Sequence, residues 1–373
     1  MSRLIRLIII VGLLGGFVLG VCGAMLYIIS GGQPIDWVQK QFAQFTLASR
    51  ADDLNRAILP GDATPLRFTI NPGDTPRIIG QNLVSAGLIE DAGLFVDYVR
   101  ANEIDRQLQA ATYFLSRGQN LREIAASLQD ASASQIRFGF AEGTRLEQIA
   151  ALIDSPDYRP YFLFSGTEFL SIVGLGAAGQ LDPSLLQAWG IPPSASLEGF
   201  LYPDTYSLSP NTTAVDLRNT LLANFQQRVS PQLIADAAAQ GLSLYQVVTL
   251  ASIIQREALH ADEHPLIASA YRNRLQIGMK LDADPTIQYA IGFRDGTWWP
   301  RITAAEYTSV VHPYNTYLNT GFPPGPIASP GLSAIQAAVY PAESAYFFFR
   351  ADCRSDGYHD FAITYEEHLA NGC

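Results

Sequence analysis

Residues 242–259 read LSLYQVVTLASIIQREAL, and this stretch predicts one amphipathic helix. Ser243 followed three residues later by Gln246 forms a capping box, which marks the start of a helix. Apolar residues then recur on one face of the helix, which predicts a stripe packed against a core: Leu244, Val247, Val248, Ala251 and Ile254. The stretch therefore predicts a helix with a single buried face.

Glu257 extends this apolar face. It lies one turn beyond Ile253 and Ile254 and two turns beyond Leu250. A carboxyl group in such a place is partly desolvated, which favours its neutral form and raises its pKa. A general acid that works near neutral pH needs this raised pKa. From this helix alone, Glu257 is better interpreted as an ordinary charged residue at the helix edge. A catalytic role for it therefore depends on evidence from the neighbouring segments.

Residues 196–206, SLEGFLYPDTY, combine carboxylates with aromatic rings. Glu198 and Asp204 stand beside Tyr202 and two further aromatic residues. Carboxylates can bind sugar hydroxyls and aromatic faces can stack on sugar rings. The segment therefore predicts part of a carbohydrate cleft.

Residues 312–331, HPYNTYLNTGFPPGPIASPG, predict a long loop. Long loops rich in Pro, Gly, Asn and Tyr usually line a functional site. The loop carries Tyr314, Asn315 and Tyr317, which we predict to bind substrate.

Residues 271–292 add two polar candidates, Asn273 on a helix and Asp284 directly before Pro285. Each also has a structural interpretation. Asn273 could be a hydrogen-bonded core amide, and Asp284 could be a turn or cap residue.

Composition excludes several classes of protein. The 373 residues are 48% hydrophobic and 16% charged, which predicts folded domains, two of them by length. The net charge is −11 and no Lys/Arg cluster occurs, which argues against a nucleic-acid partner. A neutral or mixed-charge polysaccharide remains open.

The N-terminus predicts a membrane anchor in residues 1–30. From Leu7 to Ile29 the chain has no charged residue, and a spanning helix needs about 20 residues. Arg3 and Arg6 precede this run, which leaves the N-terminus in the cytoplasm and the rest of the chain outside. The alternative is a cleaved signal peptide.

Two of the three cysteines, Cys353 and Cys373, lie near the C-terminus in a compartment where disulfides persist. They either pair or remain two free thiols.

After a predicted stalk at residues 31–65, one pattern occurs three times. The strand-like RFTI, TYFL and RFGF each precede a glycine, namely Gly73, Gly118 and Gly143. A short helix with apolar residues six and ten positions after the glycine follows each time. A small residue at position seven would let each helix sit close to its strand. The alternative is three unrelated strand-to-helix turns.

The first of these units, FTINPGDTPRIIGQNL, resembles a LysM module, which binds N-acetylglucosamine polymers. We therefore predict a LysM-like α/β subdomain at residues 66–155. Residues 156–373 would form a second, α+β domain, with helices from about 213 to 280 and strands near the C-terminus.

Together these segments resemble the YceG-like endolytic murein transglycosylases over roughly residues 66–370 plus the anchor. The motifs are ASIIQRE, ADPTIQY, LEGFLYPDTY, PYNTY, GFPPGPI and GYHDFAITYEEH. The resemblance implies that Glu257 is the catalytic acid. Many members have Glu where this chain has Gln255, which leaves Glu257 as the candidate. Phe322 and Ser329 replace the usual Leu and Asn and do not affect this assignment.

The resemblance also implies the reaction. Glu257 would protonate the leaving oxygen between N-acetylmuramic acid and N-acetylglucosamine, and then deprotonate the muramic C6 hydroxyl. Internal attack by that hydroxyl gives a 1,6-anhydro end, which terminates elongation of the nascent strand. Peptidoglycan strands are the implied partner, together with membrane-bound wall-synthesis enzymes.

Three rival functions remain. One is a lysozyme-like hydrolase that uses Glu257 with Glu198 or Asp284 as second carboxylate. Another is a non-catalytic wall-binding scaffold. The third is a pyridoxal-phosphate lyase, which needs a Schiff-base lysine and would have only Lys280 outside the stalk. No metal or cofactor is expected, because no cluster has ligand spacing.

Overall fold

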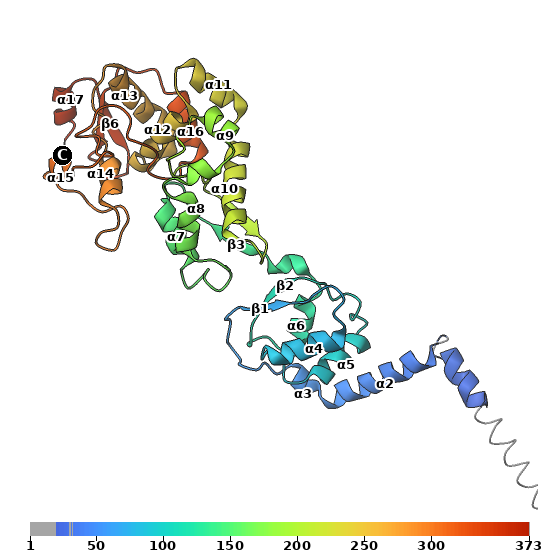
Figure 1. Ribbon diagram of the computed structural model, residues 1–373. Helices are drawn as coiled ribbons and strands as arrows, with labels where there is room; N and C mark the ends of the chain where they lie inside the picture. The colour runs from blue at the N-terminus through green and yellow to red at the C-terminus, as the bar shows by residue number, and fades with distance from the viewer. Residues whose placement is uncertain (1–19, 30, 32, 373) are drawn as a thin grey trace, which may run out of the picture. The chain divides into compact units, whose positions relative to one another are not determined.

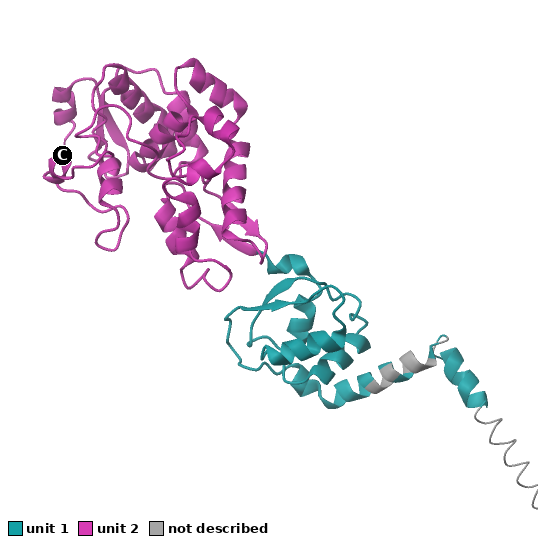
Figure 2. Ribbon diagram, viewed as in Figure 1, with its two compact units in different colours: residues 1–135 teal, residues 136–373 magenta. Residues whose placement is uncertain are grey.

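The computed structural model describes residues 20–29, 31 and 33–372 (Figure 1). The chain divides into two compact units, residues 1–135 and residues 136–373 (Figure 2). Each unit has its own set of helices and its own short antiparallel sheets. The fold therefore mixes helices and sheets, as predicted.

The first unit is built on one two-stranded sheet. Strand β1 (Leu66–Thr69) pairs antiparallel with β2 (Thr112–Leu115), with Phe68 opposite Tyr113. Helices α2 (Pro34–Ser49) and α3 (Ala51–Leu54) precede the strands in the sequence. Helices α4 (Pro76–Ser85) and α5 (Ala92–Ala101) lie between the strands, and α6 (Leu121–Ser127) and η1 (Ala131–Ser134) follow them.

The three predicted strand–turn–helix units are confirmed. They are β1 with α4, β2 with α6, and β3 (Ile136–Gly139) with α7 (Leu146–Ile153). The predicted apolar positions of these helices are all buried: Ile79, Leu83, Ile124, Leu128, Ile149 and Ile153. Gly73 and Gly143 have positive φ values of 92° and 78°, which glycine adopts without strain.

Gly80, the small residue seven positions after Gly73, has a different role from the one predicted. A Cβ atom on Gly80 would lie 3.0 Å from the carbonyl oxygen of Ala92 and 3.2 Å from the Phe95 ring. Both neighbours belong to the start of α5. Gly80 therefore permits close packing of α4 against α5 rather than against its own strand.

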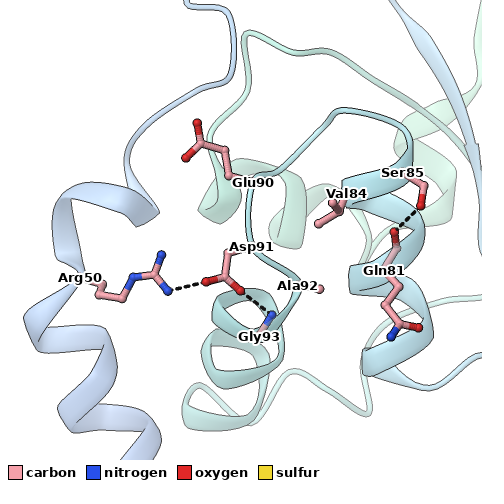
Figure 3. Close-up of a pocket in the computed structure, with 8 residues that line it drawn as sticks. All are labelled: Arg50, Gln81, Val84, Ser85, Glu90, Asp91, Ala92 and Gly93. Carbon is pink, nitrogen blue, oxygen red and sulfur yellow. Dashed lines mark hydrogen bonds and ion pairs between the residues drawn. The ribbon is translucent and has the colours of Figure 1, made fainter.

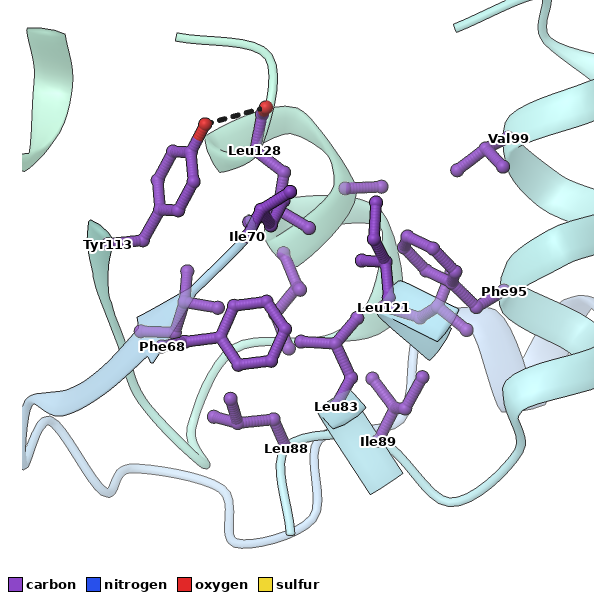
Figure 4. Close-up of a cluster of buried hydrophobic side chains, with 14 of the residues drawn as sticks. Phe68, Ile70, Leu83, Leu88, Ile89, Phe95, Val99, Tyr113, Leu121 and Leu128 are labelled. Carbon is purple, nitrogen blue, oxygen red and sulfur yellow. Dashed lines mark hydrogen bonds between the residues drawn. The ribbon is translucent and has the colours of Figure 1, made fainter. Parts of the chain in front are cut away.

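The predicted stalk is not a free linker along its whole length. Helix α2 packs against α5, and Leu54 of α3 is part of the hydrophobic core. That core also contains Phe68, Leu83, Phe95 and other apolar residues (Figure 4). Burial of this apolar surface is the main force that holds α2 and α3 on the unit.

The second unit contains two further sheets. Strand β3 pairs antiparallel with β4 (Thr205–Leu208), and β5 (Phe348–Ala351) pairs with β6 (His359–Ala362). Its helices after α7 are α8 (Gly166–Val173), η2 (Ala177–Gln180), α9 (Pro183–Trp189), α10 (Ala214–Arg228), α11 (Pro231–Ala239), α12 (Leu244–Glu257), η3 (Ala261–Glu263), α13 (His264–Gln276), α14 (Asp284–Ile291), α15 (Glu306–Ser309), α16 (Leu332–Val339) and α17 (Tyr365–Ala370).

The boundary between the units falls at residues 135/136 rather than at the predicted 155/156. Phe138 of β3 lies opposite Tyr206 of β4, so the third strand–helix unit belongs with the second unit. A sequence pattern that repeats locally carries no information about this distant strand partner.

Helix α12 begins at the predicted capping box. Gln246 N donates to Ser243 Oγ at 3.2 Å, and Ser243 N donates to Gln246 Oε1 at 3.0 Å. The prediction of a single buried face is wrong, because every residue from Val247 to Ile254 is buried. Contacts with α11, α13, α14 and α16 surround the helix and explain this burial.

Among the described residues, no single helix has both the length and the apolar composition of a membrane span. Gly20–Ile29 forms a shorter apolar helix. The predicted span begins at Leu7, and residues 7–19 lie outside the described part of the chain.

Candidate active site

Glu257 ends helix α12 and lines an open cavity of about 700 Å³ in the second unit. Helices α12, α13, α14, α15 and α17 and the β5–β6 hairpin all contribute side chains to its wall. The polar residues of the lining are Glu257, Tyr271, Arg274, Asp282, Asp284, Tyr307, Tyr317, Arg350, His359, Tyr365 and His368. Acidic, basic and aromatic side chains therefore meet in one hollow.

Tyr271 holds the Glu257 carboxyl group. Its hydroxyl donates to Glu257 Oε1 at 2.5 Å, and its side chain is almost wholly buried on α13. Burial raises the pKa of Tyr271 well above its usual value, so the hydroxyl keeps its proton and acts as the donor. The second oxygen of Glu257 is left for other partners.

The pKa of Glu257 is raised to about 7, chiefly because burial disfavours the charged carboxylate. The nearby negative charge of Asp284 raises the pKa further. The hydrogen bond from Tyr271 and the positive charges of Arg274 and Arg256 act in the opposite direction. Glu257 is thus a carboxyl group that can give and take a proton near neutral pH.

Asp284 and Tyr317 form a second hydrogen-bonded pair in the cavity. Tyr317 Oη donates to Asp284 Oδ1 at 2.7 Å, and the Tyr317 ring stacks on Tyr307 with centroids 4.3 Å apart. Burial raises the pKa of Asp284, while the bond from Tyr317 lowers it. The structure therefore brings three of the predicted site residues together: Glu257, Asp284 and Tyr317.

Asn273 and Asn315 serve as scaffold amides instead. Asn273 Nδ2 donates to the carbonyl oxygens of Ser344 and Tyr346, at 3.0 and 2.8 Å. Asn315 Nδ2 donates to the carbonyl oxygens of Tyr307 and Val310, at 3.1 and 2.8 Å. Both side chains hold loops in place, and neither lines the cavity.

Glu198 and Tyr314 also lie outside the cavity lining. Glu198 is buried and accepts a hydrogen bond from the backbone N–H of Leu146 at 3.2 Å. Burial raises its pKa to about 8. The Tyr314 ring packs against Tyr289, with centroids 4.8 Å apart.

Tyr202 and Asp204 are engaged with helix α10. Arg228 on this helix forms an ion pair with Asp204 at 2.8 Å and lies over the Tyr202 ring at 5.6 Å. Asn224 adds a hydrogen bond to Asp204 at 3.1 Å. The motif at 196–206 thus holds β4 and α10 together, and none of its predicted site residues lines the cavity.

Neighbours of Glu257 on the helix point elsewhere. Gln255 Oε1 accepts a hydrogen bond from Gly331 N at 2.9 Å, and the Arg256 guanidinium lies 4.1 Å from the centre of the Trp299 ring. Neither residue lines the cavity. The geometry favours position 257, not 255, as the proton-transfer position.

Sequence reasoning missed Tyr271, Arg274 and His359. Arg274 is buried and donates to the carbonyl oxygens of Phe347 and Leu281, both at 2.5 Å. Tyr271 and Arg274 flank Asn273 within the quoted segment 271–292, so the motif pointed to the right helix. His359 lies within the quoted motif GYHDFAITYEEH, but nothing in the sequence connects it with residues a hundred positions earlier.

No group of three His, Cys, Asp or Glu residues within the described part of the chain could hold a metal ion. Lys280, the lysine that a pyridoxal-phosphate lyase would need, is exposed and donates to the carbonyl oxygen of Tyr317 at 2.7 Å. It does not line the cavity.

The first unit has an open cavity of its own, of about 590 Å³ (Figure 3). Arg50 forms an ion pair with Asp91 there at 2.5 Å, and Asp91 Oδ1 also caps α5 through Gly93 N at 2.7 Å. None of the eight residues that line this cavity is aromatic. It therefore offers no ring for stacking on a sugar.

Cys353 lies between β5 and β6, and its sulfur is 3.9 Å from the carbonyl oxygen of Asn371. Cys373 lies outside the described residues. Pairing of the two cysteines stays a prediction, which labelling of free thiols in the oxidised protein would test.

The chain is similar to known proteins of one family. A model of the YceG-like family matches residues 68–372. A crystal structure of a YceG-like protein from Listeria monocytogenes is similar with a TM-score of 0.56 and 28% identity, over 82% of this chain and 98% of that one.

Two curated relatives are named endolytic murein transglycosylase. The relative from Streptococcus pneumoniae serotype 2 is 28% identical over 335 residues, which cover 84% of this chain and 60% of the relative. The relative from Bacillus subtilis is 29% identical over 309 residues, 82% of this chain and 83% of the relative. This chain thus spans less than two thirds of the pneumococcal relative. Because the family model covers most of its length, the chain belongs to the YceG-like family.

Proposed function

We propose that this chain cuts the glycan strands of peptidoglycan as an endolytic lytic transglycosylase, with Glu257 as its catalytic acid. The observation that carries the proposal is a half-buried carboxyl group, with its pKa raised to about 7, that lines an open cavity. The names of the two curated relatives support the same reaction class.

Glu257 acts twice in this reaction. Its proton passes to the oxygen that leaves the anomeric carbon of N-acetylmuramic acid, and the bond between that carbon and oxygen breaks. The carboxylate then takes the proton of the C6 hydroxyl, whose oxygen bonds to the same carbon. Proximity of the C6 hydroxyl favours this internal attack, which consumes no water.

Asp284 and Tyr317 support the step in this proposal. Positive charge develops at the anomeric carbon in the transition state, and a nearby carboxylate stabilises it electrostatically. Tyr317 fixes the orientation of Asp284 through its 2.7 Å hydrogen bond.

A lysozyme-like hydrolase is the second candidate, and one observation favours it. Asp284 shares the cavity with Glu257, so a second carboxylate is available, whereas Glu198 lies elsewhere. Mass spectrometry of the products released by the full-length protein separates the two reactions. We expect 1,6-anhydro ends, and reducing ends would establish the hydrolase.

We also propose that residues 66–115 of the first unit act as a LysM-like glycan-binding module. Strands β1 and β2 pair with each other, and two helices connect them in the sequence. The FTINPGDTPRIIGQNL motif covers the end of β1 and most of α4, the first of these helices. Binding of chitin-type oligosaccharides by residues 31–135, measured by calorimetry, tests this. Absence of binding would leave only a packing role for the unit.

The N-terminal segment is proposed to anchor the enzyme in the membrane with the catalytic unit outside the cell. The active site would then cut new strands close to membrane-bound synthesis enzymes and so limit their length. Sequencing the N-terminus of the mature protein tests retention of the anchor. A start near Met1 supports it, and a start after Ala24 would mean a processed signal peptide.

A further inference from the structure

A histidine in the same cavity has no role in the proposed reaction so far. His359 begins strand β6, lines the cavity and packs edge-on against the Phe349 ring, with centroids 5.5 Å apart. Its imidazole Nδ1 lies 2.9 Å from Glu263 Oε2. Its backbone N–H donates to the other oxygen of the same carboxylate at 2.8 Å.

These two bonds fix both the position and the tautomer of the ring. Glu263 is buried at the end of η3, and each of its oxygens is held by one group of His359. A carboxylate oxygen only accepts hydrogen bonds, so the imidazole proton sits on Nδ1. In the neutral ring, Nε2 is then an acceptor, because the hydrogen bond made by one ring nitrogen sets the protonation of the other.

Nε2 is the ring nitrogen of His359 that neither of these bonds uses, and His359 lines the cavity. Within the described residues Nε2 has no hydrogen-bond partner. The atom is also not fully enclosed by protein, so a ligand can reach it. His260, which directly precedes η3, differs because its Nε2 has a partner and its side chain does not line the cavity. Its Nε2 lies 2.8 Å from the carbonyl oxygen of Asp356, and its ring stacks on Tyr358.

We propose that His359 contacts the bound glycan strand directly, with Nε2 accepting a hydrogen bond from a sugar hydroxyl group. Glu263 is the positioning residue that keeps Nε2 unprotonated in the neutral ring and aimed into the cavity. This inference rests on the proposed function, because it takes the same glycan as substrate. A metal-bound histidine is not an alternative here, since no third ligand residue in the described chain completes a site with this pair.

Substitution with chemical rescue tests the contact. In the full-length protein in detergent, His359→Ala should lower kcat/KM on glycan strands about 2- to 10-fold, the loss expected when one neutral hydrogen bond to substrate is removed. Added imidazole can enter the space vacated in the open cavity and should restore part of the rate. His260→Ala is the matched control and should neither lose activity nor respond to imidazole.

Glu263→Gln tests the positioning role. The amide no longer dictates which ring nitrogen carries the proton, so kcat/KM should fall while thermal melting shows a folded protein. An unchanged kcat/KM in His359→Ala would overturn the inference. A loss that imidazole does not restore would assign His359 a structural role and overturn it as well.

Strand binding separates this inference from the proposed function. In a Glu257→Gln background, which binds without cutting, the added change His359→Ala should weaken glycan binding about 2- to 10-fold. If the Glu257→Gln protein binds glycan and His359→Ala changes nothing, only the present inference fails. If the Glu257→Gln protein does not bind glycan at all, the proposed function fails and this inference with it.

Discussion

Two glutamates with raised pKa values, the half-buried Glu257 and the fully buried Glu198, show how a carboxyl group open to a cavity differs from an enclosed one. Glu257 and Glu198 both owe the raised pKa first to burial. Only Glu257 lines a cavity, whereas Glu198 is enclosed and bonded to the backbone of Leu146. Access to the cavity, rather than the raised pKa, is therefore what supports the proposed catalytic role of Glu257.

Glu257→Gln should abolish cleavage and keep the fold. The amide cannot transfer a proton, so the rate should fall by about 10²- to 10⁴-fold, the usual contribution of a general acid. Glycan cleavage and thermal melting should be measured together. Glu198→Gln is the matched control, because it changes a buried glutamate outside the cavity. Cleavage at the wild-type rate by Glu257→Gln would remove this residue from the mechanism.

Tyr271→Phe should move the pH dependence of the reaction. The acid must be protonated before cleavage, so the wild-type rate should fall as the pH rises through about 7, the pKa of Glu257. The hydrogen bond from Tyr271 lowers that pKa because it stabilises the carboxylate. Its removal raises the pKa of Glu257 in the free enzyme and shifts the falling limb of kcat/KM to higher pH. A profile that stays in place would show that Tyr271 only packs.

At the scale of elements, local signals were readable from the sequence and distant pairings were not. The capping box at Ser243 and the apolar positions after Gly73, Gly118 and Gly143 predicted their helices, because caps and periodicity act within a few residues. The pairing of β3 with β4 joins Ile136 to Leu208 and has no local signal. The same holds for the bond between His359 and Glu263.

The candidate site shows the same division. The local patterns marked the segments that carry Glu257, Asp284 and Tyr317, and the family resemblance then singled out Glu257. Tyr202 and Asp204 carried equal promise in the sequence. Their true partner, Arg228, lies on a helix that the motif does not include. Residue type can suggest binding, but only packing decides whether the side chain is already engaged.

Glu198 should make the stability of the second unit depend on pH. Its pKa is about 8 in the folded protein and near the ordinary 4.5 when unfolded. Between these values the folded state keeps a proton that the unfolded state has lost, so the free energy of unfolding falls as the pH rises. The loss is complete above pH 8 and amounts to a few kcal/mol, at about 1.4 kcal/mol for each unit of pKa.

Glu198→Gln removes this titration and keeps a neutral side chain that can still accept the hydrogen bond from Leu146 N at the start of α7. Melting temperature measured from pH 5 to pH 9 should therefore fall less steeply in the variant than in the wild type. The variant should gain most above pH 8. Parallel melting curves across this range would contradict the raised pKa.

At the scale of the whole molecule, chemistry and strand binding are assigned to different units. Every residue that lines the Glu257 cavity lies between positions 257 and 368, within residues 136–373. The LysM-like motif lies within residues 1–135. The proposed reaction and the proposed glycan binding by the LysM-like motif therefore fall in different units.

The isolated fragment 136–373 should fold and cut short glycans as the full-length protein does, since it retains the complete cavity wall. If the first unit binds glycan as proposed, a long strand has a binding site on each unit of the intact protein. Linking two binding sites on one chain raises apparent affinity by about 10²-fold or more without any new contact. The fragment should therefore show an unchanged kcat and a much higher KM on long strands, with little change on short ones. The same measurement on the full-length protein with a disrupted first unit, Leu83→Asp, should reproduce this pattern, because Leu83 is completely buried in that unit's core. Equal KM values for fragment and full-length protein on long strands would show that the first unit does not hold the substrate.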